Sequence, residues 1–269
     1  MKNRKKRGTF LWALSLAGLA TLIGVWYLVS FLLRQQGNQM IPLPHETVGL
    51  TASLLFGEYA ASTWMAIGWT LLRVIIGISI SFLIGGILGI LAGLFKPIRK
   101  FLNPLAAVSR TIPTVAVVLV LISIIMGAGQ HKWLPWVPVA LTFVVAFPLF
   151  YESFASGMEA EPQEEIDALS LEGAKRSLQA IIHVYLPDAW PFIELSLVQS
   201  IGMAVKVSIM SEVLTATSAG MSGIGTMIIL SRHNDGGLET IPAYSLIALG
   251  LMIIIDIPFW ILKKKKNEQ

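Results

Sequence analysis

The sequence predicts an all-α membrane protein with six transmembrane helices, and its composition and the placement of its basic residues both favour this class. Apolar residues make up 55% of the 269 residues and charged residues only 13%, whereas a soluble domain carries about 25% charged residues. Because the chain has no cysteine, a disulfide framework, a thiolate metal site and a cysteine nucleophile are excluded. The four histidines are dispersed without ligand spacing, so no metal site is expected.

Six segments are long and apolar enough to cross a membrane, which takes roughly 20 mostly apolar residues per helix. The predicted spans are residues 10–33, 63–94, 105–126, 134–152, 189–214 and 241–262. The first is longer than the apolar part of a signal peptide, so we expect it to be retained. We therefore predict a single transmembrane domain over residues 1–269.

Lysine and arginine gather on one side of these spans. They lie before the first span, after the second, between the fourth and fifth, and after the last. By the positive-inside rule this side is cytoplasmic, and both termini lie on it. Residues 34–62 are then an extracytoplasmic segment and residues 153–188 a cytoplasmic loop. The pI near 9.3 is explained by this topology and does not indicate nucleic-acid binding.

Small residues recur every four positions along the second span, and such a stripe predicts a helix-packing face because it lets two backbones approach closely in lipid. The stripe consists of Gly77, Ser81, Gly85, Gly89 and Gly93. Near the other end of the chain, residues 222–237 are too short and too rich in glycine for a full span, and we expect a partial helix and turn there.

The cytoplasmic loop alternates acids, bases and aliphatic residues as a soluble protein does. Pro162, with acids behind it, predicts a helix start, and Gly173 permits a sharp turn. A second amphipathic helix is expected to follow, ending at Leu186-Pro187, with one apolar face: Leu178, Ile181, Ile182 and Tyr185. Such a helix pair predicts a docking surface, although a solvated basic face would also explain Lys175 and Arg176.

This loop resembles the EAA loop of ABC importer permeases. Asp167-Ala168-Leu169, Gly173 and Leu186-Pro187 stand where that pattern has Glu-Ala-Ala, Gly and Leu-Pro. The sequence departs from it by Asp for Glu, by Leu169 for the second Ala, and by one extra residue before Leu-Pro. Further segments across residues 40–262 resemble the nitrate/sulfonate/taurine-type permeases: IPLPHETV (41–48), TLLRVIIG (70–77), NPLAAVSRTIP (103–113) and MGAG (126–129).

The resemblance implies a type I ABC importer permease fold in a bacterial cytoplasmic (inner) membrane. It implies a homodimer that works with a cytoplasmic ATPase dimer and an extracytoplasmic substrate-binding protein, and a small, anionic solute such as a sulfonate, nitrate or taurine. The chain itself would be no enzyme and bind no cofactor, since ATP and Mg²⁺ would be used by the ATPase; its sequence has no GxxxxGK[ST] phosphate loop. The coupling residues it implies are Asp167, Ala168, Gly173, Ala174, Lys175, Arg176, Leu186 and Pro187.

A charged residue within a predicted span is costly and marks either function or pairing. Lys206, Glu212 and Arg73 are candidates for the translocation path. The alternative is an internal ion pair or a side chain that reaches the membrane surface.

Other functions stay open. A secondary, ion-coupled transporter would need carboxylates in the membrane, for which only Glu212 and Asp256 are candidates. A membrane enzyme would need clustered acids or histidines near the membrane surface. An ABC permease for a thiamine-precursor-like compound is a third possibility.

Overall fold

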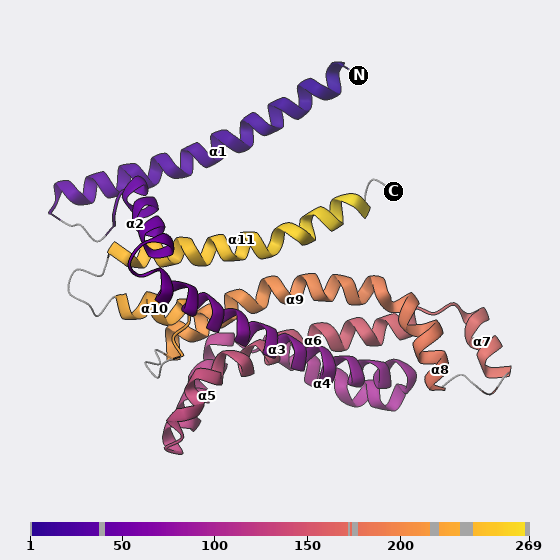
Figure 1. Cartoon of the computed structure of the whole chain (residues 1–269). Coiled ribbons are helices and arrows are strands. Elements are labelled where there is room, and N and C mark those ends of the chain that lie inside the picture. The colour runs from indigo at the N-terminus through magenta and orange to yellow at the C-terminus, as the bar shows by residue number, and fades with distance from the viewer. Residues whose placement is uncertain are drawn as a thin grey trace. The chain divides into compact units, whose positions relative to one another are not determined.

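The computed structural model describes residues 2–37, 41–171, 173, 177–215, 221–231 and 239–266, and in these ranges every regular element is helical (Figure 1). The first half of the chain contains α1 (Lys2–Gln35), α2 (Pro44–Phe56), α3 (Ala60–Leu94), α4 (Lys96–Thr111), α5 (Thr114–Gly127) and the 3₁₀ helix η1 (His131–Trp136). The second half contains α6 (Val137–Glu159), α7 (Gln163–Leu171), α8 (Leu178–Ala180), the π-helical turn η2 (Ile181–Tyr185), α9 (Leu186–Thr215), α10 (Ile224–Ser231) and α11 (Thr240–Lys266).

Five of the described helices are long and apolar enough to cross a membrane, or six spans result if one bent pair counts as a span. The five are Leu14–Gln35, Ala60–Leu94, His131–Glu159, Leu178–Thr215 and Thr240–Ile257. The bent pair is α4 with α5. The predicted all-α, multi-span architecture is therefore confirmed.

The third predicted span, residues 105–126, is not one straight helix. The chain turns by 96° between α4 and α5, and Figure 1 shows the break. Ile112 and Pro113 both take extended backbone angles, with ψ values of 129° and 120°. The cause is Pro113, because a proline ring disfavours helical angles in the residue before it and donates no backbone hydrogen bond. The prediction of a continuous helix here was wrong.

The chain divides into two compact units, residues 1–63 with 228–247 and residues 64–227 with 248–269. In the first unit, α1 is tied to the start of α2. Trp26 Nε1 and Ser30 Oγ each donate to the carbonyl of Pro42 over 3.2 Å, and Arg34 forms an exposed ion pair with Glu46. A hydrogen bond from the Leu43 backbone, aided by Arg34, lowers the pKa of Glu46. The entry to the predicted 34–62 segment is thus held by polar contacts.

In the second unit, α3 lies against α6 along the stripe of small residues. A Cβ built on Gly89 would stand 2.6 Å from the carbonyl oxygen of Tyr151, and one built on Gly93 would stand 2.4 Å from the Cβ of Met158. Gly77 and Gly85 leave similarly little room against the same helix. The distances at Gly77, Gly89 and Gly93 are below 3.0 Å, which real Cβ atoms essentially never show, so the two helices pack there at a separation that only glycine allows.

Helix α6 also packs along α9, and Figure 1 shows the two side by side. Their contact is close, since a Cβ built on Gly157 would stand 2.4 Å from the Cβ of Ala189. Around it Phe150, Phe154 and Tyr185 belong to one buried apolar cluster. This pairing holds the two ends of the predicted cytoplasmic loop next to each other.

Candidate functional site

The coupling segment, named for its predicted role and defined as residues 161–188, begins with a helix, as the sequence predicts. Helix α7 follows Pro162 and carries Glu164 and Glu165 in its first turn, where the helix dipole favours acids. After α7, Gly173 adopts φ +68°, the left-handed region that favours glycine. Ala174, Lys175 and Arg176 lie outside the described residues. Ser177 then caps the next helix, its Oγ accepting a hydrogen bond from the amide of Ala180 at 3.0 Å.

The second helix of the segment does not end at Leu186-Pro187. Residues 178–215 instead form one helix that continues into the membrane span. The π turn η2 interrupts it, and there the amide of Leu186 bonds to the carbonyl of Ile181, five residues earlier. A π turn takes up one additional residue, which matches the extra residue found before Leu-Pro. The wider turn also gives the Pro187 ring room that a regular α-helix lacks.

This added residue changes which side chains share a face. Leu178 is 71% exposed and Ile182 49% exposed, whereas Tyr185 is buried. The residues of the predicted apolar face therefore differ in burial, and the π turn departs from the uninterrupted α-helical period that the prediction assumed. Leu171, at the end of α7, is 89% exposed although α7 is not a candidate span. The segment thus presents one strongly exposed apolar side chain, Leu171, on a helix that is not a candidate span.

Of the other predicted coupling residues, Asp167, Ala168 and Pro187 are exposed. Leu186 is partly buried and packs against the apolar cluster between α6 and α9. The structure therefore places the aspartate and alanine of the EAA-like pattern on an accessible helix, and places the leucine of the Leu-Pro pair at the base of the segment.

Three carboxylates meet where the coupling segment joins the long helices. One oxygen from each of Glu161, Glu165 and Asp188 lies within 4.8 Å of the others. Burial, together with the two neighbouring carboxyl groups, raises the pKa of Glu161 to about 7. Sequence reasoning missed this group, since Asp188 is distant along the chain and only the return of α9 to the end of α6 brings it near Glu161.

A second polar site is buried among α3, α9 and α10, and it contains two of the predicted path residues. Arg73 Nη1 lies 2.7 Å from Glu212 Oε1, and the two side chains are only 2% and 1% exposed. Thr70 Oγ1 donates to the same carboxylate, at 2.9 and 3.0 Å from its oxygens. The amide of Gly225 donates to Glu212 Oε2 over 3.0 Å. Arg73 also donates to the carbonyl of Met221.

This network fixes the predicted partial helix at residues 222–237, of which Ile224–Ser231 is helical and 232–238 lie outside the described residues. Glu212 accepts from the first turn of α10, where the helix dipole favours an anion. A Cβ built on Gly223 would stand 2.2 Å from the Glu212 carboxylate, so α10 approaches this closely only because glycine is there. Arg73 and Glu212 thus form an internal ion pair, which the sequence analysis gave as the alternative to a role in the translocation path.

Lys206, the third predicted path residue, has different surroundings. It is exposed on α9, and among the described residues no carboxylate forms an ion pair with it. The neighbouring helix brings an acid close, since a Cβ built on Gly202, one turn before Lys206, would stand 3.2 Å from Asp256 Oδ1. Asp256 is also exposed. Lys206 and Asp256 therefore offer opposite charges from neighbouring helices within the spans.

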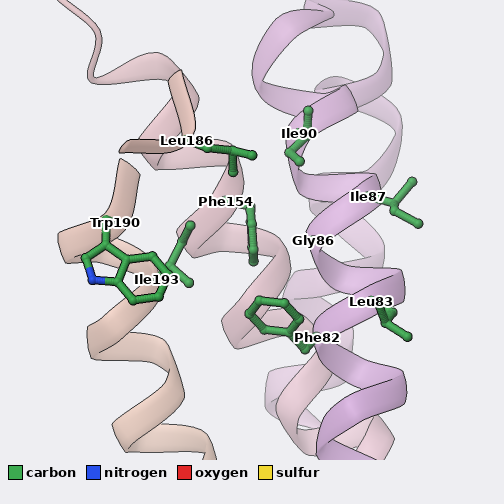
Figure 2. Close-up of a pocket in the computed structure, with 9 residues that line it drawn as sticks. All are labelled: Phe82, Leu83, Gly86, Ile87, Ile90, Phe154, Leu186, Trp190 and Ile193. Carbon is green, nitrogen blue, oxygen red and sulfur yellow. The ribbon is translucent and has the colours of Figure 1, made fainter. Parts of the chain in front are cut away.

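A pocket of about 330 Å³ lies beside α3, α6 and α9. Figure 2 shows its lining, which is Phe82, Leu83, Gly86, Ile87, Ile90, Phe154, Leu186, Trp190 and Ile193. No charged group is among these residues, and the indole N–H of Trp190 is their only polar side-chain group. Because a charged solute needs convergent polar groups, this pocket suits an apolar chain and not an anion.

Comparisons with known proteins point to a transport family. Residues 81–264 match the family described as "Binding-protein-dependent transport system inner membrane component". The chain is 28% identical over 217 residues to the taurine transport system permease protein TauC of Escherichia coli (strain K12), covering 80% of this chain and 74% of that protein. It is 29% identical over 196 residues to the trimethylamine N-oxide transport system permease protein TmoV of Pelagibacter ubique (strain HTCC1062), covering 72% of this chain and 25% of that protein.

Proposed function

Because the chain belongs to the family of binding-protein-dependent transport system inner membrane components, and is thus a permease subunit of an ABC importer for a small solute, we propose that it forms the path for an anionic solute. It couples to a cytoplasmic ATPase dimer through residues 167–187. It works as a homodimer with both termini in the cytoplasm, and an extracytoplasmic binding protein delivers the solute.

The observation that carries this proposal is the exposed helix-turn segment between two membrane helices. Asp167, Ala168 and the apolar Leu171 are exposed on a helix that is not a candidate span. This helix, with Leu171 89% exposed, is accessible to a protein partner. The left-handed turn at Gly173 fixes where this helix ends. A soluble motor that docks here acts on α9, whose first residues, Leu186 to Asp188, belong to the same segment.

The anionic solute is supported by the surroundings of Lys206. A lysine at mid-membrane costs about 2.5–3.5 kcal/mol on insertion scales, which disfavours a position facing lipid tails. An exposed lysine on a spanning helix, in no ion pair with a described carboxylate, is therefore best placed facing a watery path between two copies of the chain. The family relatives are named for taurine and for trimethylamine N-oxide, and a taurine-like sulfonate fits a cation at this position.

ATP-driven uptake distinguishes the importer from an ion-coupled transporter. We expect proteoliposomes that hold the permease and its ATPase to accumulate solute only when both ATP and the binding protein are supplied. An ATPase variant that binds ATP without hydrolysing it is the control and should give no accumulation. Accumulation driven by an ion gradient without any ATPase would contradict the proposal.

Lys206 can be tested in the same assay. Removing a charge-assisted contact worth about 1.5–3 kcal/mol should lower uptake of an anion by roughly tenfold or more in Lys206→Ala, while Lys206→Arg retains most of it. Met203→Ala, at another exposed position one turn earlier on α9, is the matched control and should transport normally. Undiminished uptake by Lys206→Ala at normal membrane levels would remove this residue from the path.

A further inference from the structure

The acidic group at the base of the coupling segment has no role in the proposed transport cycle. Glu161 follows the end of α6, Glu165 lies in the first turn of α7, and Asp188 lies in the first turn of α9. The group thus joins three elements that meet at the point where the segment leaves the membrane-spanning helices.

Glu161 is the unusual member of this group. The residue is only 6% exposed, and neither carboxylate oxygen has a hydrogen-bond partner among the described residues. Within the described part of the chain, no lysine or arginine forms an ion pair with Glu161, Glu165 or Asp188. A buried carboxylate without a partner is costly, and two further carboxylates nearby add like-charge repulsion. Among the described residues, which do not include Lys175 and Arg176, no positive charge is paired with this group.

We infer that Glu161, Glu165 and Asp188 form a binding site for one hard divalent cation of the Mg²⁺, Mn²⁺ and Ca²⁺ class. Such cations prefer carboxylate oxygens, at about 2.0–2.1 Å for Mg²⁺ and about 2.3–2.6 Å for Ca²⁺. Two oxygens on opposite sides of one ion are then about 4–5 Å apart. The three carboxylate oxygens, all within 4.8 Å of one another, match this span.

The exposure of the three residues fits an exchangeable ion. Glu165 and Asp188 are exposed while Glu161 is buried, so the ion has one inner ligand and two ligands at the surface. Water completes the coordination on the open side. The sequence did not predict a metal site because it offered no histidine pattern, and these acids become neighbours only in the folded chain.

A bound ion would link the end of α6 to the first turns of α7 and α9, and so fix the base of the coupling segment. This consequence for coupling rests on the proposed function. The binding site does not, because it depends only on the three carboxylates. A failure to bind cations would therefore leave the transport function intact, and a failure of ATP-driven uptake would leave the site intact.

The test uses the full chain, purified in lipid nanodiscs and stripped with EDTA. Mn²⁺ is titrated and followed by electron paramagnetic resonance, and the melting temperature is measured with Mg²⁺ or Ca²⁺ in separate arms. Wild type should bind Mn²⁺ and melt at a higher temperature with at least one of the three ions. Glu161→Gln and Asp188→Asn should bind Mn²⁺ at least tenfold more weakly, since loss of even an outer-shell partner costs about 10–100-fold.

Glu164→Gln is the matched control, because Glu164 is an exposed acid in the same turn of α7 and lies outside the group. It should bind Mn²⁺ as wild type does. Glu161→Gln should melt in EDTA no lower than wild type, because the substitution removes repulsion; this keeps loss of binding separate from misfolding. The inference is overturned if wild type binds no ion, or if Glu164→Gln weakens binding as much as Glu161→Gln does.

Discussion

Replacing Glu212 by glutamine is expected to lower the free energy of unfolding by about 3–5 kcal/mol, the typical cost of removing one partner from a buried ion pair. The substitution leaves the Arg73 guanidinium buried without its carboxylate. It also weakens the hydrogen bonds from Thr70 and from the amide of Gly225. Thermal melting of the purified chain in nanodiscs measures the effect, with membrane levels as a second readout.

A double variant makes this prediction specific to the pair. Arg73→Met combined with Glu212→Gln removes both charges and should be more stable than Glu212→Gln alone, because the unpaired charge is then gone. Arg34→Gln breaks the exposed pair with Glu46, whose side chains are 37% and 32% exposed, and should change stability little. A Glu212→Gln protein of normal stability that fails to transport would instead favour a role of Glu212 in the path.

Replacing Gly173 by valine is expected to abolish most ATP-driven uptake while the membrane part of the protein stays folded. Gly173 has φ +68°, and a Cβ built on it meets nothing within 4 Å. The strain is thus in the backbone alone, at about 1–2 kcal/mol, and relaxing it moves the end of α7. Because asparagine tolerates this conformation, Gly173→Asn should keep much of the uptake.

Gly37 provides the control for backbone strain in general. It has φ +76° and open space around its built Cβ, but it lies in the turn after α1. Gly37→Val should pay a similar local cost and still transport at a rate near wild type. Equal uptake by Gly173→Val and wild type would contradict a coupling role for this turn.

Hydropathy was sufficient to predict the helical membrane class, because each span carries its signal within its own residues. It was insufficient at Pro113, where one local backbone restriction turns a candidate span into two helices. The small-residue stripe of α3 was also visible in the sequence, since its spacing alone places Gly85, Gly89 and Gly93 on one face. The sequence did not show that α6 is the helix that packs against this face.

The same difference between local sequence signals and tertiary contacts applies to the sites. The EAA-like pattern predicted where the coupling segment lies, but it did not predict the π turn at residues 181–185, which takes up one additional residue in the second helix. Lys206 and Glu212 looked alike in the sequence, as charges in one span. Only the folded chain separates them, since Glu212 meets Arg73 from a different helix while Lys206 stays exposed. Pairing of residues distant along the chain is a tertiary property that no local pattern contains.

Site-specific cross-linking between the coupling segment and the ATPase tests the central claim most directly. The chain has no cysteine, so Ala168→Cys gives a single thiol at an exposed position of α7. Ala52→Cys, exposed on α2 in the predicted extracytoplasmic segment, is the matched control. We expect a short bifunctional reagent to join the ATPase to the cysteine at position 168, in a nucleotide-dependent way, and not to the one at position 52. A co-produced ATPase that supports uptake but never cross-links at position 168 would contradict coupling through this segment.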